Sequence, residues 1–271
     1  MKKAKVMVHP SYKIGEIDRR LFGAFLEPIG DWVYGGIYNP THPTADDLGF
    51  RKDMMELTKE LGIPAVRLPG GNFMSGWEWK DSIGPKDQRK AHLDLAWRQI
   101  ETNEVGHDEY LEWAKRVGTE AIYTLNLGTG TSQDALHCVE YTNVEGGTYW
   151  SDLRKKNGYE KPHKVKMWCL GNEMDGPWQI DSWERDPRGY GIKTREIAKI
   201  VKYIDPDCEI VVAGSSTPNN RTYPRWDLEV LNECYNKVDY LSLHYYHNAP
   251  EGDIGAFLNA STVMDEFIEN E

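Results

Sequence analysis

The sequence predicts an α/β fold in which a parallel sheet curls into a β/α barrel. Apolar runs of strand length alternate six times with helical patterns, which is typical of parallel strands joined by right-handed crossovers. The alternation also fits an open, doubly wound sheet. However, polar residues follow the C-terminal ends of several strands, and a barrel gathers those ends around one mouth, whereas an open sheet spreads them along an edge. The barrel is therefore favoured.

The first predicted elements lie between the N-terminus and Gly62. Residues 5–15 predict a short strand and turn ahead of the main body, and residues 21–29 (LFGAFLEPI) form the first strongly apolar strand. Asp46 and Asp47 then supply N-cap chemistry for a helix that Gly62 ends. The predicted apolar face of this helix consists of Phe50, Met54, Leu57 and Leu61.

A long irregular segment separates the second predicted strand from the next helix. Residues 65–68 form that strand, and residues 71–106 follow without a regular pattern. Loops of this length in compact domains tend to be functional. This one carries Trp77, Trp79 and Trp97. A helix at 107–117, ended by Gly118, and a strand at 120–127 come next.

The second half of the chain continues the alternation. Its predicted elements are a helix at 132–141, a strand at 165–170, a helix stopped by Pro206, a strand at 209–213, a helix at 226–235, a strand at 240–246 and a final helix at 253–269. Gly128 and Gly130 resemble the start of a dinucleotide fingerprint, but Gln133 stands where the third glycine belongs. We interpret this segment as a plain strand-to-helix turn and expect no cofactor.

Composition argues against several functional classes. The net charge is −11 and the basic residues are scattered, which is unfavourable for nucleic acid and for an anionic substrate. No apolar run approaches a membrane span, and the N-terminus has no apolar export signal. The four widely spaced cysteines, at 138, 169, 208 and 234, indicate reduced core thiols in a cytoplasmic protein. Among the histidines only His244 and His247 have metal-ligand spacing, and on a strand two residues three apart point to opposite faces, so no metal is expected.

Polar residues mark the predicted mouth of the barrel. They are Glu27 after the first strand, Asn72 after the second, Asn172 and Glu173 after the fourth, and His244 and Tyr246 at the sixth. Glu173, in the G-N-E that ends an apolar run, is the first candidate for a catalytic group. Carboxylates, amides and aromatic rings around one pocket suit a neutral sugar, which offers hydroxyls to polar groups and C–H faces to tryptophans.

Each of these residues also has a simpler structural interpretation. Glu27 can cap a helix or pair with Arg67, and Asn72 can occupy a left-handed turn. His244 can be a satisfied core histidine. The three loop tryptophans can be anchors that bury surface area, and Glu173 alone can be a solvated loop carboxylate.

Five motifs in order resemble a known family. They are R-L-P-G-G-N-F at 67–73, L-D-L-A-W-R-Q-I-E-T-N-E-V-G at 93–106, L-N-L-G-T-G-T at 125–131, W-C-L-G-N-E-M-D-G-P-W-Q at 168–179 and L-S-L-H-Y-Y at 241–246. Together they closely resemble the α-L-arabinofuranosidases of glycoside hydrolase family 51. The resemblance implies a (β/α)8 TIM barrel with a C-terminal β-sandwich. In this chain, residues 21–271 correspond to the barrel, and residues 1–20 contribute to the accessory sandwich.

The same resemblance implies roles for individual residues. Glu173 matches the general acid/base of a retaining glycosidase, and Arg67 resembles an arginine that orients the nucleophile. The positions that match sugar-binding residues are Glu27, Asn72, Trp97, Asn172, His244 and Tyr246. The implied substrate is a neutral saccharide from which terminal non-reducing α-L-arabinofuranosyl units are released, and the intact protein is expected to be a homo-oligomer.

The chain departs from the family in one respect. The family's nucleophile lies on strand seven, whereas only six strands are counted here. We therefore expect an incomplete barrel that lacks strands seven and eight, the nucleophile and the C-terminal sandwich. We expect it to be inactive by itself and prone to associate through its unpaired edges. Turnover that depends on Glu173 would make Glu27 or Asp175 the nucleophile. The alternatives are another retaining barrel glycosidase acting on xylan or glucan, and a sugar-binding module without chemistry.

Overall fold

A six-stranded parallel sheet forms the centre of the structure, a computed structural model that describes residues 3–248 and 251–270. The strands, in their order across the sheet, are β1 (Ala24–Phe25), β2 (Ala65–Leu68), β5 (Glu120–Leu125), β6 (Met167–Leu170), β7 (Glu209–Ala213) and β8 (Tyr240–Ser242). The order in space follows the order in the chain. A doubly wound sheet reverses its strand order, so this sequential winding excludes that alternative and identifies a partial β/α barrel.

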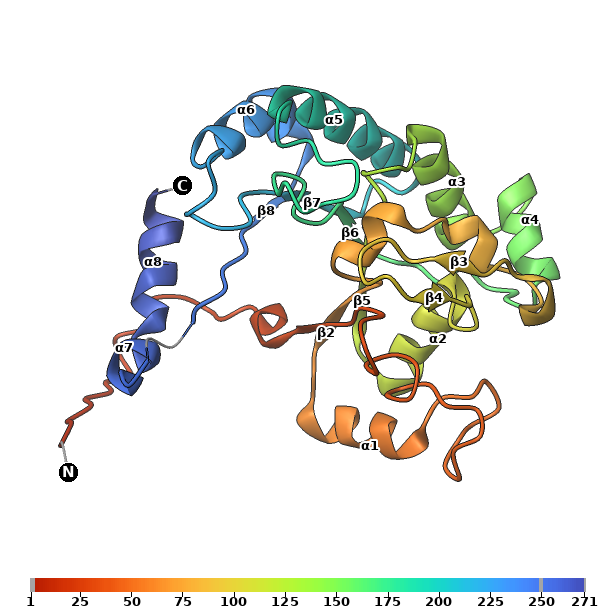
Figure 1. The fold of residues 1–271 in the computed structure, drawn as a ribbon, viewed down its shortest axis with the longest axis horizontal. Helices are drawn as coiled ribbons and strands as arrows, with labels where there is room; N and C mark the ends of the chain where they lie inside the picture. Colours follow the sequence, from red (N-terminus) through yellow and green to blue (C-terminus); the bar gives the residue numbers. More distant parts are fainter. Residues whose placement is uncertain (1–2, 249–250, 271) are drawn as a thin grey trace.

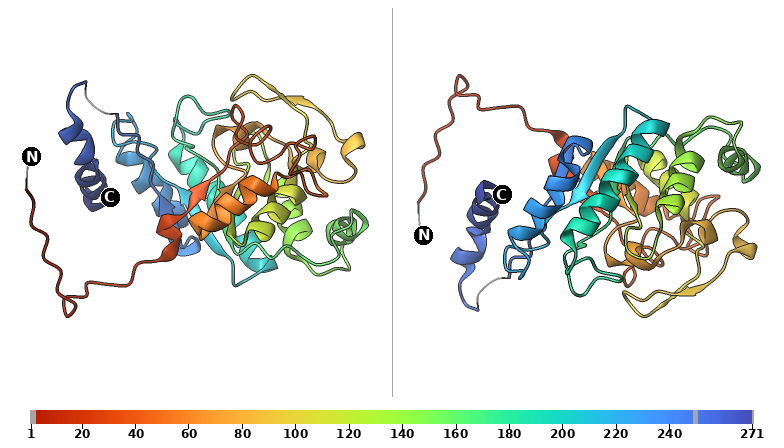
Figure 2. Two further views of the ribbon diagram at one scale, coloured as in Figure 1. Left: turned by 90° about the horizontal axis from the view of Figure 1, so that it is seen from below. Right: turned by 90° about the horizontal axis from the view of Figure 1, so that it is seen from above.

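The sheet curves, and most helices lie on its convex side. The helices are α1 (Lys52–Leu61), α2 (His107–Val117), α3 (Ser132–Asn143), α4 (Tyr149–Lys156), α5 (Pro187–Ile204), α6 (Arg225–Cys234), α7 (Ile254–Leu258) and α8 (Ala260–Asn270). Figure 1 shows α1 to α6 in an arc around the sheet, with α7, α8 and the N-terminal segment on the open side. The two further views in Figure 2 show the same separation. Among the described residues, β1 pairs only with β2, and β8 only with β7.

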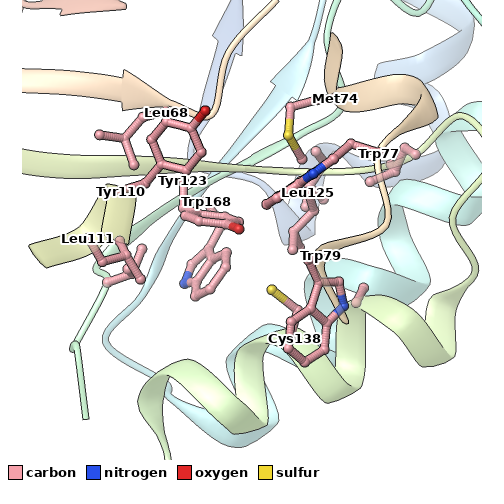
Figure 3. Close-up of a cluster of buried hydrophobic side chains, with 14 of the residues drawn as sticks. Leu68, Met74, Trp77, Trp79, Tyr110, Leu111, Tyr123, Leu125, Cys138 and Trp168 are labelled. Atoms are coloured by element: carbon pink, nitrogen blue, oxygen red, sulfur yellow. The ribbon is translucent and has the colours of Figure 1, made fainter. Parts of the chain in front are cut away.

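Alternation along the strands gives the sheet two different faces. Tyr123, Leu125 and Trp168 point toward the helices and join the large hydrophobic core there. Figure 3 shows part of this core, in which these side chains meet residues of α2 and α3. The intervening residues Met167, Cys169 and Val211 form a separate, smaller cluster on the barrel interior. All four cysteines are free and buried, as predicted.

Arg20 closes the N-terminal end of the barrel interior. Its guanidinium Nε and Nη2 donate to the carboxylate of Glu120, at 2.7 and 2.6 Å, and Nη1 lies 2.8 Å from Glu209 Oε2. The hydroxyl of Tyr240 also donates to Glu209 at 3.0 Å. Glu120 begins β5 and Glu209 begins β7, so the Arg20 side chain connects two strands, and Tyr240 at the start of β8 joins them through Glu209.

The predicted helix at 107–117 and strand at 209–213 are confirmed with the same bounds. The predicted strand at 65–68 is also confirmed with the same bounds. The remaining predicted strands of the sheet are too long at one or both ends. In place of residues 21–29, only Ala24–Phe25 pair, because Arg19–Phe22 form a 3-10 helix before them. The last strand ends at Ser242 and not at 246.

The predicted cap of the first helix was wrong. Asp46 accepts hydrogen bonds from the backbone N–H groups of Leu48 and Phe50, which forms a turn, and α1 begins only at Lys52. Phe50 is therefore buried outside the helix. The predicted apolar face, which was counted from Phe50, does not match the face that α1 buries. Within the helix Met55 is the buried residue, whereas Leu57 and Leu61 are exposed. Gly62 does end the helix, with φ of 65°.

Three further segments differ from the prediction. Helix α4 was not predicted, and the final helix divides at Asn259 into α7 and α8. Residues 5–15 contain a turn but no strand. The irregular segment 71–106 contains short 3-10 helices and a two-stranded hairpin, β3 (His92–Leu93) with β4 (Ile100–Glu101). The sandwich expected from residues 1–20 and the association through open edges stay predictions. No helix in the described ranges has the length and apolarity needed to cross a membrane.

Candidate active site

One pocket of about 600 Å³ gathers every side chain that the sequence predicts for the site. It begins at the C-terminal ends of the strands and continues along the barrel interior as far as Arg20. The predicted residues that line it are Glu27, Arg67, Asn72, Trp97, Asn172, Glu173, His244 and Tyr246. The expected convergence at one mouth is therefore observed.

The chain turns sharply after β6 and presents Glu173 to the pocket. Gly171 and Glu173 have positive φ angles, 91° and 48°, and the Gly176 N–H donates to the Glu173 carbonyl at 2.8 Å. A left-handed conformation is uncommon for a residue other than glycine, so this turn is strained. It leaves the Glu173 side chain 11% exposed at the mouth of the pocket.

Both carboxylate oxygens of Glu173 have partners. Nδ1 of His244 lies 2.9 Å from Oε1, and the indole Nε1 of Trp178 donates to Oε2 at 2.8 Å. Burial raises the pKa of Glu173, but these two hydrogen bonds, with the charges of His244 and Arg67, outweigh it and hold the pKa below its ordinary value of 4.5. With these partners, Glu173 is an ionised carboxylate at neutral pH.

Side-chain amides connect Glu173's neighbour to the second strand. Arg67 Nη1 donates to Asn172 Oδ1 at 3.1 Å, and Asn172 Nδ2 donates to Asn72 Oδ1 at 3.0 Å. Gln179 Nε2 donates both to Asn72 Oδ1, at 2.9 Å, and to the Asn172 carbonyl, at 2.6 Å. These four side chains, from two strand ends and one loop, hold one another in place and form one polar wall of the pocket.

Glu27 forms the opposite polar wall. Its Oε1 accepts hydrogen bonds from Trp97 Nε1 at 2.7 Å and from the Phe73 N–H at 3.2 Å. Burial raises the Glu27 pKa, although these hydrogen bonds and the Arg67 charge act in the opposite direction. Gly71 is required beside it, because a Cβ at Gly71 would lie 1.9 Å from the Glu27 carboxyl group. Glu27 therefore does accept a backbone N–H from the first turn of the 3-10 helix Asn72–Gly76, as the simpler interpretation allowed, but it forms no close ion pair with Arg67.

The loop tryptophans divide into two kinds. Trp77 and Trp79 are buried, and their indole nitrogens donate to Asn103 and to the Asp134 carbonyl, so the simpler interpretation as loop anchors is correct for them. Trp97, at the tip of the β3–β4 hairpin, is 37% exposed and lines the pocket.

His244 and Tyr246 follow the end of β8. His244 is held by Glu173 and is not a core histidine. Tyr246 is 77% exposed but lines the pocket. Partial desolvation, with the charges of Glu173 and Glu27, raises the pKa of its hydroxyl. No group of three or more metal-ligating side chains occurs in the part of the chain that the structure describes.

Two contacting residues were missed by the prediction, and one was misjudged. Trp178 and Gln179 belong to the motif at 168–179, yet their return toward Glu173 and Asn72 depends on a turn that local sequence patterns do not reveal. Asp175, considered as a possible nucleophile, is fully buried and does not line the pocket.

Comparison with known proteins places this geometry in a family. The family described as "Alpha-L-arabinofuranosidase 1 domain" matches residues 57–266. An "intracellular exo-α-(1→5)-L-arabinofuranosidase 1" of Bacillus subtilis (strain 168) is 49% identical, covering 100% of this chain and 54% of the relative. An "exo-α-(1→6)-L-arabinofuranosidase" of Bifidobacterium longum is 43% identical, covering 100% of this chain and 52% of that protein.

Solved structures give the same result. A family 51 α-L-arabinofuranosidase from Bifidobacterium longum has a TM-score of 0.89 at 43% identity, covering 93% of this chain and 50% of that one. The chain spans about half the length of the curated relatives it matches. The match over most of the sequence and the shared curved parallel sheet lead to one conclusion: this chain belongs to the α-L-arabinofuranosidases of glycoside hydrolase family 51.

Proposed function

We propose that this chain supplies the acid/base half of a retaining glycoside hydrolase that releases terminal non-reducing α-L-arabinofuranosyl units from arabinose-containing oligosaccharides and polysaccharides. The family membership and the printed names of the relatives support this substrate class. The names differ in linkage, (1→5) in one relative and (1→6) in another, so both linkages are candidates here.

The observation that carries the proposal is the position of Glu173 beside an ordered amide wall. Asn172 is held between Arg67 and Asn72, which aims its amide at the same space that the Glu173 carboxylate faces. A hydrogen bond to the sugar 2-hydroxyl that strengthens in the transition state contributes to glycoside hydrolysis. We assign that contact to Asn172, and contacts to the furanose ring to Glu27, Asn72 and Trp97.

Two displacements follow from this assignment. Glu173, once protonated, donates its proton to the leaving oxygen while a second carboxylate attacks the anomeric carbon. Glu173 then accepts a proton from the water that releases the sugar. In retaining enzymes the two carboxyl groups lie about 5 to 5.5 Å apart, and that proximity raises the pKa of the acid.

The second carboxylate must differ from those around this pocket. Of the described residues that line it, Glu27 is the one other carboxylate, and its Oε1 already accepts two hydrogen bonds in a buried position. We therefore assign Glu27 to binding, place the nucleophile on a seventh strand as the resemblance implies, and expect saccharide binding without appreciable turnover from the described residues alone. Arg67 and Tyr246 are proposed to face that nucleophile, beside His244.

A binding experiment with a turnover arm tests the proposal. Calorimetry of the 271-residue chain should give binding of α-(1→5)- or α-(1→6)-arabinobiose that Asn172→Ala abolishes, and xylobiose should not bind. Equal binding of xylobiose would favour a xylan-active glycosidase, and no saccharide binding would contradict the proposal. Hydrolysis of an aryl α-L-arabinofuranoside that Glu173→Gln abolishes would instead identify Glu27 as the nucleophile.

Location and assembly complete the proposal. The Bacillus subtilis relative is named intracellular, which supports a cytoplasmic location for this chain. The homo-oligomeric state expected for the intact protein stays a prediction, which the molar mass in solution tests.

A further inference from the structure

Asp175 follows Glu173 by two residues and does not line the pocket. Its side chain is fully buried, and its Oδ2 accepts three hydrogen bonds. The donors are the N–H of Ser216 at 3.0 Å, the hydroxyl of Ser216 at 3.0 Å and the side-chain amide of Asn220 at 2.8 Å. Ser216 and Asn220 belong to the loop between β7 and α6, so Asp175 connects the loop after β6 to the loop after the neighbouring strand.

Asn220 strengthens this connection through the backbone. Its amide also donates to the carbonyl of Asp175 at 3.1 Å. Both the side chain and the main chain of Asp175 are therefore held by one residue of the neighbouring loop. The connection fixes the backbone only two residues after Glu173.

The turn itself requires such external support. Glu173 has a φ of 48°, a conformation that side chains other than glycine adopt rarely and keep only where the surroundings determine it. On the N-terminal side of Glu173, the Gln179 side chain donates a hydrogen bond to the Asn172 carbonyl. Met174, which follows Glu173, is fully buried. Asp175 provides the hold on the C-terminal side.

We propose that Asp175 is a positioning residue that keeps Glu173 in its left-handed conformation, and so keeps the carboxylate between His244 and Trp178. The inference rests on the proposed role of Glu173 as acid/base and extends it to a residue that touches no substrate. The connection also links the Glu173 turn to the loop after β7. The position of the Glu173 carboxylate therefore depends on the distance between the ends of β6 and β7.

The geometry of Asp175 provides a matched pair of variants. All three donors converge on Oδ2, while Oδ1 has no hydrogen-bond partner among the described residues. The carbonyl oxygen of an asparagine can therefore accept the same three hydrogen bonds, whereas alanine can accept none. Asp175→Asn should keep the connection and Asp175→Ala should remove it.

The neighbouring loop offers a milder pair. Asn220→Ala removes both amide hydrogen bonds without removing a buried carboxyl group. Asn219→Ala is its control, because Asn219 is exposed and its side chain makes no hydrogen bond within residues 3–248. This second pair decides the question if Asp175→Ala does not fold.

The indole N–H of Trp178 reports the position of Glu173 in solution. It donates to Glu173 Oε2, so its ¹H–¹⁵N resonance in the full chain should move as Glu173 titrates. Trp178→Phe assigns the resonance, and Glu173→Gln should abolish its movement with pH. The indole of Trp77, which donates to Asn103, serves as an internal reference for the fold.

The expected result is loss of the pH-dependent displacement of the Trp178 resonance in Asp175→Ala and Asn220→Ala, with the Trp77 resonance unchanged. Asp175→Asn and Asn219→Ala should behave like the wild type. A wild-type displacement in both Asp175→Ala and Asn220→Ala would overturn the inference. Because the readout requires no turnover, failure of the arabinofuranosidase assignment with this result intact would leave the positioning role standing.

Discussion

The indole nitrogen of Trp178 lies 2.8 Å from Oε2 of Glu173, so a side chain five residues farther along the chain folds back over the candidate acid. This hydrogen bond stabilises the charged form, which contributes to the lowered pKa of Glu173. Trp178→Phe removes the donor and should raise that pKa. The ¹³C shift of the Glu173 carboxyl group, followed against pH and assigned with Glu173→Gln, measures the change.

Trp183→Phe is the matched control for that substitution. Trp183 lies in the same loop, but its indole donates to the Leu127 carbonyl at 2.9 Å and not to Glu173. It should leave the Glu173 titration unchanged. The sign also applies to stability: a carboxyl whose folded pKa is lowered stabilises the fold above 4.5, and this contribution is lost as the pH falls through the lowered value. Trp178→Phe should therefore reduce the amount of stability that the fold loses at acidic pH.

Gly71 and Gly62 separate backbone strain from a collision in the pocket. Both have positive φ, 70° and 65°, but only at Gly71 would a Cβ meet the Glu27 carboxyl group. Gly62→Ala should cost about 1 kcal/mol of unfolding free energy and leave saccharide binding intact. Gly71→Ala should cost about 2 kcal/mol or more and abolish binding, because Glu27 is displaced. Urea denaturation and calorimetry measure the two effects; equal binding by both variants would contradict the role of Glu27.

Asp175 gives a prediction for stability against pH. Burial raises its pKa, so the ionised form destabilises the folded state above the folded pKa, and this penalty disappears as the pH falls below the ordinary value of 3.8. Asp175→Asn lacks the penalty and should melt at a higher temperature than the wild type at pH 7, with the difference shrinking toward pH 4. The same substitution at exposed Asp207 should have no such effect, and calorimetric melting checks both.

Arg20 tests how the open sheet is held together. Solvent partly screens its bidentate contact with Glu120 and its contact with Glu209, because the Arg20 side chain is 26% exposed. Arg20→Ala should therefore lower the free energy of unfolding by about 1–2 kcal/mol, which is more than a single exposed ion pair contributes. This loss should be smaller at high salt. Exposed Arg19 is the control, and Arg19→Ala should be neutral in the same urea titration. Equal stability of the two variants would show that the network contributes little.

The elements that the sequence predicted well are those with local signals. Helix α2 has Gly118 at its end and apolar spacing throughout, and β7 is a continuous apolar run. The position of Glu173 followed from an apolar strand that ends in G-N-E, and the convergence of Glu27, Asn72 and His244 followed from parallel strands sharing one end.

The features that the sequence did not predict depend on contacts between distant segments. Asp46 and Asp47 look like caps, but one bonds its own turn and the other pairs with Arg116, 69 residues away. Trp178 reaches Glu173 because Gly176 lets the chain fold back: a Cβ there would lie 2.4 Å from the indole. Neither relationship has a periodic signature, so only the three-dimensional arrangement reveals it.

Adding arabinobiose to the ¹⁵N-labelled chain, while following the indole resonances of Trp97 and Trp178, tests most directly whether the pocket beside Glu173 binds an arabinofuranosyl unit. Trp97 reports the wall formed by Glu27, and Trp178 reports Glu173, on the other side of one pocket. We expect both resonances to shift together with a single dissociation constant, and xylobiose to shift neither. Unchanged resonances, or equal shifts with xylobiose, would contradict an arabinofuranosyl site beside Glu173.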